Sequence, residues 1–148
     1  MAEPTEIDWA LIKLGDGDSP EVFTIVCGIQ DVTINQPVNT TDRSVRDCAA
    51  PGRVPTRKIR VNSRQMDVTG SGLSNAETIE DLNAALGKKR NYRIELYQDD
   101  ETDTGLLLGT YAGEYVLTAN NLTTTREGDS TAEITLASNG AWTYTPAP

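Results

Sequence analysis

The segment from Thr33 to Thr56, TINQPVNTTDRSVRDCAAPGRVPT, decides how the rest of this sequence is interpreted. It contains almost no large apolar residue, and it follows neither the period of 2 typical of a strand nor the period of 3.6 typical of a helix. A structureless loop of this length is uncommon in a compact domain and is usually functional, disordered or a linker. The sequence therefore predicts an extended loop at about residues 35–56, and the question is what such a loop serves.

Charge is distributed unevenly around this loop. Seven of the 13 basic residues lie between Arg43 and Arg64, where only Asp47 opposes them, so this segment carries +6. Because the whole chain carries −9, the remainder carries −15. A basic segment on an acidic body can pair with another copy of itself, although a solvated basic edge that limits aggregation explains the charge equally well. The negative total argues against nucleic acid as an attractive partner.

The sequence offers few groups for catalysis. It has no histidine, the commonest general base and metal ligand, and its two cysteines cannot form a four-thiolate zinc site. The acidic segment 99–105 does not match the spacing of a calcium loop. Glu95 and Glu114 are expected to face outward as solvated strand carboxylates, so a hydrolase with paired carboxylates is the least favoured interpretation. We expect no enzymatic activity, no cofactor and no metal site.

The N-terminal sequence MAEPTEIDWALIKL lacks the basic start and apolar core of a secretory signal. No apolar run approaches the roughly 20 residues that a membrane-spanning helix needs. We therefore expect a protein that is made in the cytoplasm and has no membrane partner.

Apolar periodicity predicts a mainly β chain with one helix. The helix is expected at about residues 74–86, begun by a capping box of Ser74 and Glu77 and ended at Gly87. Changes of apolar phase predict a bulge or turn near Gln30 and a long bent strand over residues 57–72. Asn139-Gly140 is typical of a hairpin turn. These elements predict a single α+β domain, residues 1–148, built as a two-sheet antiparallel β-sandwich or a barrel-like body with one flanking helix and a long early loop.

The order of these elements resembles the tail tube (major tail) proteins of long-tailed bacteriophages and gene transfer agents. The resemblance rests on FTIVCGIQDVTIN, the polar excursion with NTTDRSVRDCAAPG, the bent strand RKIRVNSRQMDVTGSG, the helix, and then YRIEL, GTYAGEYVL and STAEITLASNGAWTYTP. It implies a structural virion protein, located in the tail and assembled in the host bacterium, whose hexameric rings stack into a tube. The implied partners are other copies of itself, the tail initiator or baseplate, the tape measure and the tail terminator. Genome DNA is expected to pass through the lumen without specific binding.

The resemblance also implies a role for the long loop, which in this family reaches a neighbouring subunit or ring. The residues expected to make these self-assembly contacts are Asn39, Thr41, Arg43, Ser44, Arg46, Pro51, Arg53 and Arg57. If Cys27 and Cys48 lie close together, a disulfide could form after the particle leaves the reducing cell. Two alternatives remain open, the ring protein of a type VI secretion tube and a non-catalytic β-sandwich binding module.

Overall fold

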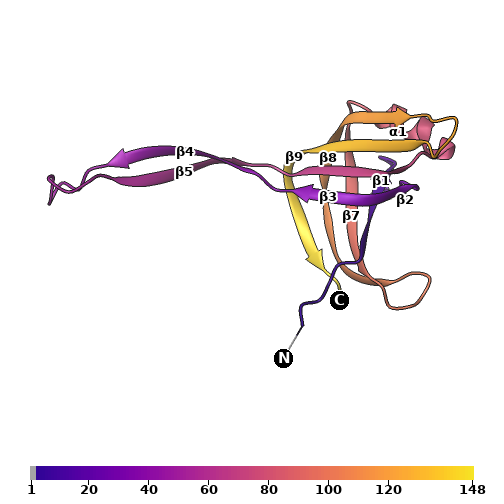
Figure 1. Ribbon diagram of the computed structural model, residues 1–148, viewed down its shortest axis with the longest axis horizontal. Coiled ribbons are helices and arrows are strands. Elements are labelled where there is room, and N and C mark those ends of the chain that lie inside the picture. The colour runs from indigo at the N-terminus through magenta and orange to yellow at the C-terminus, as the bar shows by residue number, and fades with distance from the viewer. Residues whose placement is uncertain (1–2) are drawn as a thin grey trace.

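Antiparallel strands form most of the chain in a computed structural model that describes residues 3–148. Seven strands make one sheet in the order β2-β1-β7-β8-β9-β6-β3. Their bounds are β1 (Trp9–Gly15), β2 (Phe23–Ile25), β3 (Ile29–Asn35), β6 (Asp67–Leu73), β7 (Lys89–Gln98), β8 (Leu106–Thr123) and β9 (Thr131–Pro146). The remaining two strands, β4 (Val38–Val45) and β5 (Thr56–Arg64), form a separate two-stranded sheet that projects far from the body (Figure 1).

The seven-stranded sheet curls around a single apolar core. At Gly70 on β6, an added Cβ atom would lie 2.8 Å from Ile29 of β3, 3.0 Å from Ile12 of β1 and 3.4 Å from Ile134 of β9. Strands from both ends of the sheet order therefore converge on one point, and the body is barrel-like. The predicted mainly β fold, with two antiparallel sheets and one flanking helix, is confirmed.

The helix is shorter than predicted and has a different cap. A 3₁₀ turn, η1 (Ala76–Thr78), leads into α1 (Ile79–Ala85), and the side chain of Asn75 accepts a hydrogen bond from the Glu77 amide at 3.1 Å. The predicted Ser74–Glu77 capping box is wrong, because the Ser74 amide instead donates to the Ser130 carbonyl at 3.0 Å. Asn75 serves as the cap because asparagine caps a helix as well as serine does.

Several turns and bends predicted along the strands can be compared with the structure. The register of β3 against β6 shifts between Ile29 and Asp31, which confirms the bulge near Gln30. The bent strand breaks between β5 and β6 and passes from the small sheet into the large one, as its phase change indicated. The hairpin predicted at Asn139-Gly140 is wrong. Strand β9 continues through this position, and the two residues form part of a bulge opposite Glu114.

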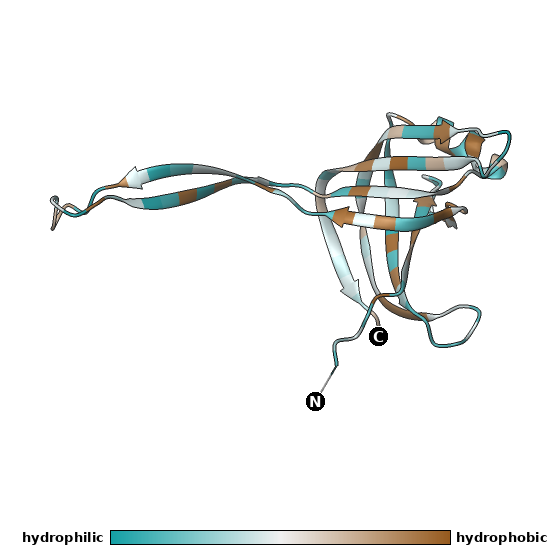
Figure 2. Ribbon diagram, viewed as in Figure 1, coloured by the Kyte–Doolittle hydropathy of each residue, from teal (hydrophilic) through white to brown (hydrophobic). Residues whose placement is uncertain are grey.

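The extended loop predicted at residues 35–56 is also corrected, because most of its first half is strand β4. Almost every side chain of β4 and β5 is exposed. Because neither face of β4 is buried, its sequence shows no alternation of apolar and polar residues. Figure 2 shows this contrast, since β4 is mostly hydrophilic whereas strands of the body carry regular hydrophobic bands.

Candidate functional site: an exposed arm and a polar strand face

The two-stranded projection, which we call the arm (Val38–Arg64), is held together by antiparallel pairing of β4 with β5 along its length. Val45 pairs with Thr56 at the far end and Val38 pairs with Arg64 at the root, with one bulge between Asn39 and Thr40. The arm contains seven basic and two acidic residues, a net charge of +5. The rest of the chain, which we call the body, contains six basic and 20 acidic residues, a net charge of −14. The molecule therefore presents two surfaces of opposite charge at separate places.

The loop residues predicted to mediate self-assembly all lie on the arm. Asn39, Thr41, Arg43 and Ser44 belong to β4, Arg57 belongs to β5, and Arg46, Pro51 and Arg53 lie in the tip between the strands. Some of them serve the arm itself. The Asn39 side chain donates to the Ser63 hydroxyl at 2.9 Å, and Asn62 donates to the Thr41 hydroxyl. Arg46 closes the tip by donating to the carbonyl oxygens of Pro51 at 2.5 Å and Arg53 at 3.5 Å.

The two faces of the arm differ in chemistry. Residues that pair across two strands share a face, so Arg43 with Lys58 and Thr41 with Arg60 lie on one face, which we call the basic face. On the opposite face Ile59 pairs with Asp42 and Val61 pairs with Thr40, and we call this the apolar face. Arg57 also lies there and forms an ion pair with Asp42, with 3.8 Å between nitrogen and oxygen. The apolar face therefore compensates its charge beside Ile59 and keeps one further cation, Arg64 at the root, whereas the basic face carries three cations and no acid.

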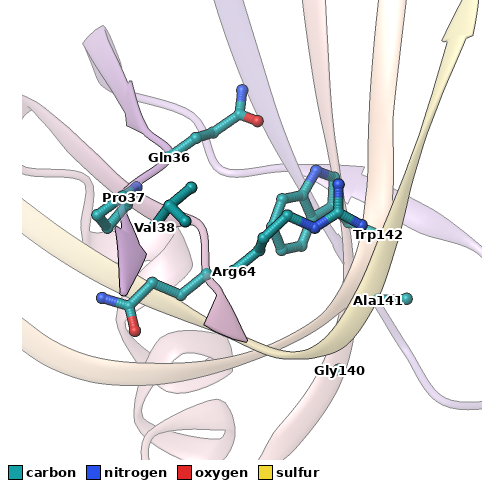
Figure 3. A pocket seen from close by; sticks show the side chains of 8 residues that line it. Gln36, Pro37, Val38, Arg64, Gly140, Ala141 and Trp142 are labelled. Atoms are coloured by element: carbon teal, nitrogen blue, oxygen red, sulfur yellow. The ribbon is translucent and has the colours of Figure 1, made fainter. Parts of the chain in front are cut away.

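The root of the arm is anchored through Met66. This residue is fully buried, its amide donates a hydrogen bond to the Ser138 hydroxyl at 3.0 Å, and its carbonyl accepts one from the Ser138 amide at 2.9 Å. Beside the root lies a cavity of about 330 Å³ between the arm and β9. Figure 3 shows the Arg64 side chain in this cavity, directed toward Trp142 of β9.

A second candidate surface is the solvent side of strands β3, β6, β9 and β8, which we call the polar strand face. Cross-strand register places its residues in rows, with Asp31, Ser71, Glu133 and Asn121 in one row and Thr33, Thr69, Thr135 and Ala119 in the next. Asp67 and Asn35 extend it toward the arm. None of these four strands, which the structure describes over their full length, contains lysine or arginine. The polar strand face is therefore a threonine-rich surface whose charged groups are all carboxylates.

The two strand carboxylates considered for catalysis have structural partners instead. Glu95 was expected to be solvated, but it is only 8% exposed and pairs with Lys13 at 3.0 Å. Tyr97 donates to its second oxygen at 2.5 Å, so Lys13 and Tyr97 cover the carboxylate on the outer side of the sheet. Glu114 accepts a hydrogen bond from Asn139. Among residues 3–148, no group of three or more histidine, cysteine, aspartate or glutamate side chains could hold a metal ion.

The two cysteines lie at opposite ends of the molecule. Cys27 follows β2 in the body, and Cys48 lies in the tip of the arm (Figure 1). Both are exposed and free. A disulfide requires Cα atoms within about 7 Å. Cys27 and Cys48 of one chain do not lie close together, so they do not form the disulfide considered above. No helix in the described part of the chain is long and apolar enough to cross a bilayer.

Comparisons with known proteins agree with this architecture. A family model described as "Phage tail tube protein" matches residues 9–144. Among curated protein sequences, none matches the chain.

Solved structures with a similar fold include chains of tail assemblies. A chain in the virion of a native gene transfer agent particle is 20% identical, with a TM-score of 0.66 over 92% of this chain and 95% of that one. A chain in the tail of an empty gene transfer agent particle, refined with C6 symmetry, is 19% identical, with a TM-score of 0.65 over 91% and 94%. The SPP1 tail tube is 13% identical, with a TM-score of 0.60 over 97% and 80%. At these identities the likeness shows a shared fold.

Proposed function

This chain belongs to the phage tail tube protein family, and from that membership we propose that six copies close into a ring and that rings stack into the hollow tube of a virion tail. The observation that supports this proposal is the arm. A two-stranded hairpin alone is marginally stable in water, yet this one extends from the body with both faces uncovered. Binding to other copies would cover it, and the opposite charges of arm and body favour that head-to-tail contact.

The interior of the tube is best formed by the polar strand face. A channel for DNA must not bind phosphate, because lysine and arginine hold DNA by releasing its counterions. Asp31, Asp67 and Glu133 instead repel phosphate, and the threonine row between them is uncharged. We propose that genome DNA passes along this face without specific binding, and that the tape measure protein is a further partner of the tube.

The remaining parts of the proposal follow from a structural role. The chain acts as one domain, residues 1–148, without catalysis or cofactor. Its partners are neighbouring copies, the tail initiator or baseplate at one end of the tube and the tail terminator at the other. The arm residues Arg43, Arg46, Arg53 and Arg57 contribute to self-assembly, together with Asn39, Thr41, Ser44 and Pro51, which shape the arm.

The test compares the intact chain with a variant that lacks the arm. Asn35 of β3 and Asp67 of β6 are paired neighbours, so Asn-Gly in place of Pro37–Gln65 closes the gap with a short turn. We expect the intact protein to form hollow tubes or six-membered rings by negative-stain electron microscopy and light scattering. The armless variant should remain a folded monomer by circular dichroism.

Two results would contradict the proposal. Normal tubes from the armless variant would show that the arm has another purpose. An intact protein that stays monomeric even with its tail initiator complex would argue against the tube itself.

A further inference from the structure

We infer that the apolar face of the arm binds in the groove between β1 and β3 of a second copy of this chain. The inference rests on the proposed function and specifies which face of the arm makes the contact and where it is received. The evidence for it is that two surfaces, each exposed in the single chain, complement one another in polarity.

The first surface is the apolar face of the arm. Ile59 is 51% exposed and Val61 is 59% exposed, although both are β-branched residues that normally pack in a sheet. The Arg57–Asp42 ion pair compensates the charges beside Ile59 and Val61, and the remaining cation of this face, Arg64, lies in the cavity at the root. The outer part of the face can therefore enter an apolar site without burying a lone ion. The basic face, by contrast, cannot enter such a site because Arg43, Lys58 and Arg60 have no acid among them.

The second surface is a groove of about 440 Å³ where the curled sheet remains open. Strand β1 pairs with β7 along one side, but on its other side only Lys13–Gly15 pair with β2. Strand β3 pairs only with β6. The groove therefore runs between two partly unpaired strand edges, which in a stable protein need a cover.

The lining of this groove suits the arm. The apolar residues that line it include Ile7, Ala10, Val32 and Ile34, and its only charged residues are Asp8 and Asp31. These apolar residues complement Ile59 and Val61, and a lining without lysine or arginine does not repel an arm of net charge +5. The cavity at the root of the arm is a poorer receptor, because Arg64 lies within it and would repel a basic segment.

The occupant must come from another copy. The arm begins immediately after β3, which forms one wall of the groove, and it extends away from the body (Figure 1). An arm with this direction cannot reach the groove of its own chain. It can reach the corresponding groove of a neighbour, and the same contact repeated from copy to copy joins the copies head to tail.

Cysteine cross-linking tests the contact in assembled tubes. In a background with Cys27→Ser and Cys48→Ser, the pair Val61→Cys and Val32→Cys places thiols on the apolar face and in the groove. Oxidation should give a ladder of covalent multimers on a non-reducing gel. The matched control, Arg60→Cys with Val32→Cys, places the arm thiol on the basic face and should give at least tenfold less cross-linked product. Tubes that form but give equal yields, or no ladder in either pair, would overturn the inference and leave the proposed function intact.

A second measurement uses the unmodified protein, so it does not depend on variants that assemble. Hydrogen–deuterium exchange should show that residues 7–10 and 30–34 become protected in tubes relative to dilute, unassembled protein, together with residues 56–63 of the arm. Protection of the arm without protection of the groove would contradict this docking alone. If the intact protein forms no tubes under any condition, both the docking and the proposed function fail.

Discussion

The Glu95 carboxylate is held between two donors on the outer side of β1 and β7. Lys13 lies 3.0 Å from one oxygen and the Tyr97 hydroxyl lies 2.5 Å from the other. The ring of Tyr97 stacks on Trp9 with 4.3 Å between centroids, so the same side chain joins a polar contact to an aromatic one. This small network joins β1 to β7 on the outer side of the sheet.

Replacing Glu95 should therefore cost stability. Glu95→Gln removes the counter-charge of a largely buried Lys13 ammonium, and we expect the free energy of unfolding to fall by about 1–3 kcal/mol in urea titrations. Glu133→Gln is the matched control, because Glu133 is exposed on the polar strand face and should change stability by less than about 0.5 kcal/mol. Equal effects of the two substitutions would show that the Lys13 pair does not stabilise the fold.

Tyrosine ionisation should also weaken the fold in alkali. Desolvation raises the pKa of Tyr92, Tyr97 and Tyr115 to about 12, and for Tyr97 the hydrogen bond to Glu95 adds to the effect. In the unfolded chain these tyrosines ionise near pH 10. The folded state therefore holds more protons between about pH 10 and 12, and stability that is complete below pH 10 is lost as the pH rises through this window.

The measurement is the urea midpoint at a series of pH values. We expect it to be constant from about pH 8 to 9.5 and to fall above pH 10, and Tyr97→Phe should make this fall shallower. A midpoint that does not change up to pH 12 would mean that the three hydroxyls ionise equally in both states.

At the scale of elements, the arm is the part whose electrostatic contacts should weaken as salt rises. Its basic face carries Arg43, Lys58 and Arg60, and attraction between exposed charges is screened as ionic strength rises. We expect the critical concentration for assembly, measured by light scattering, to rise with sodium chloride. Neutralising the basic face with Arg43→Gln, Lys58→Gln and Arg60→Gln should raise it at low salt and flatten its salt dependence.

A variant with the same loss of charge on the body provides the control. Lys88→Gln, Lys89→Gln and Arg126→Gln also removes three cations, and assembly of this variant should keep the salt dependence of the unmodified protein. If all three proteins respond to salt alike, contacts other than those of the basic face determine assembly.

The elements also show what could be predicted from the sequence. Tyr92, Ile94 and Leu96 alternate with polar residues on β7 and are buried, so periodicity identified that strand correctly. Strand β4 could not be identified in this way, because neither of its faces is covered in the single chain and a strand with no buried face needs no apolar alternation. Asn139-Gly140 misled because Gly140, with φ of 91°, suits a bulge as well as a hairpin turn.

The candidate site, like the fold, could be predicted from the sequence only in part. The excess basic charge between Arg43 and Arg64 could be seen in the sequence, since charge is a property of composition, and the structure places these residues on the arm. The separation of its two faces was missed because it depends on which residues of β4 pair with which residues of β5. The polar strand face was missed for a similar reason. The absence of lysine and arginine from β3, β6, β8 and β9 was visible in the sequence, but only the sheet order places these strands side by side.

At the scale of the whole molecule, the proposed channel can be tested by reversing its charge. Glu133→Lys with Thr135→Lys adds three positive charges per subunit to the polar strand face. Glu101→Lys with Thr102→Lys adds the same charge on the exposed loop between β7 and β8. In a closed ring, cations on the channel wall surround the DNA and attract it more strongly than cations on an outer loop.

Duplex DNA and preassembled tubes provide the measurement. At about 50 mM salt we expect DNA to co-sediment with tubes of the channel variant, and this binding should be lost as salt approaches about 200 mM because counterion release governs it. Unmodified tubes should not retain DNA, and the loop variant should retain much less than the channel variant. Equal retention by the two lysine variants would mean that the polar strand face does not line the channel.

The anchorage of the arm at Met66 has a mechanical consequence. Figure 1 shows β4 and β5 running roughly in line with β3 and β6, so a pull on the arm is directed along the strands of the body. Strand β6 is bonded to β9 from Asp67 to Leu73 on one side and to β3 on the other. A load along these strands acts on all their hydrogen bonds in shear, and they must fail together rather than one at a time. In the proposed tube, tension passed through the arm would therefore load the strands of each subunit along their length rather than peel them apart.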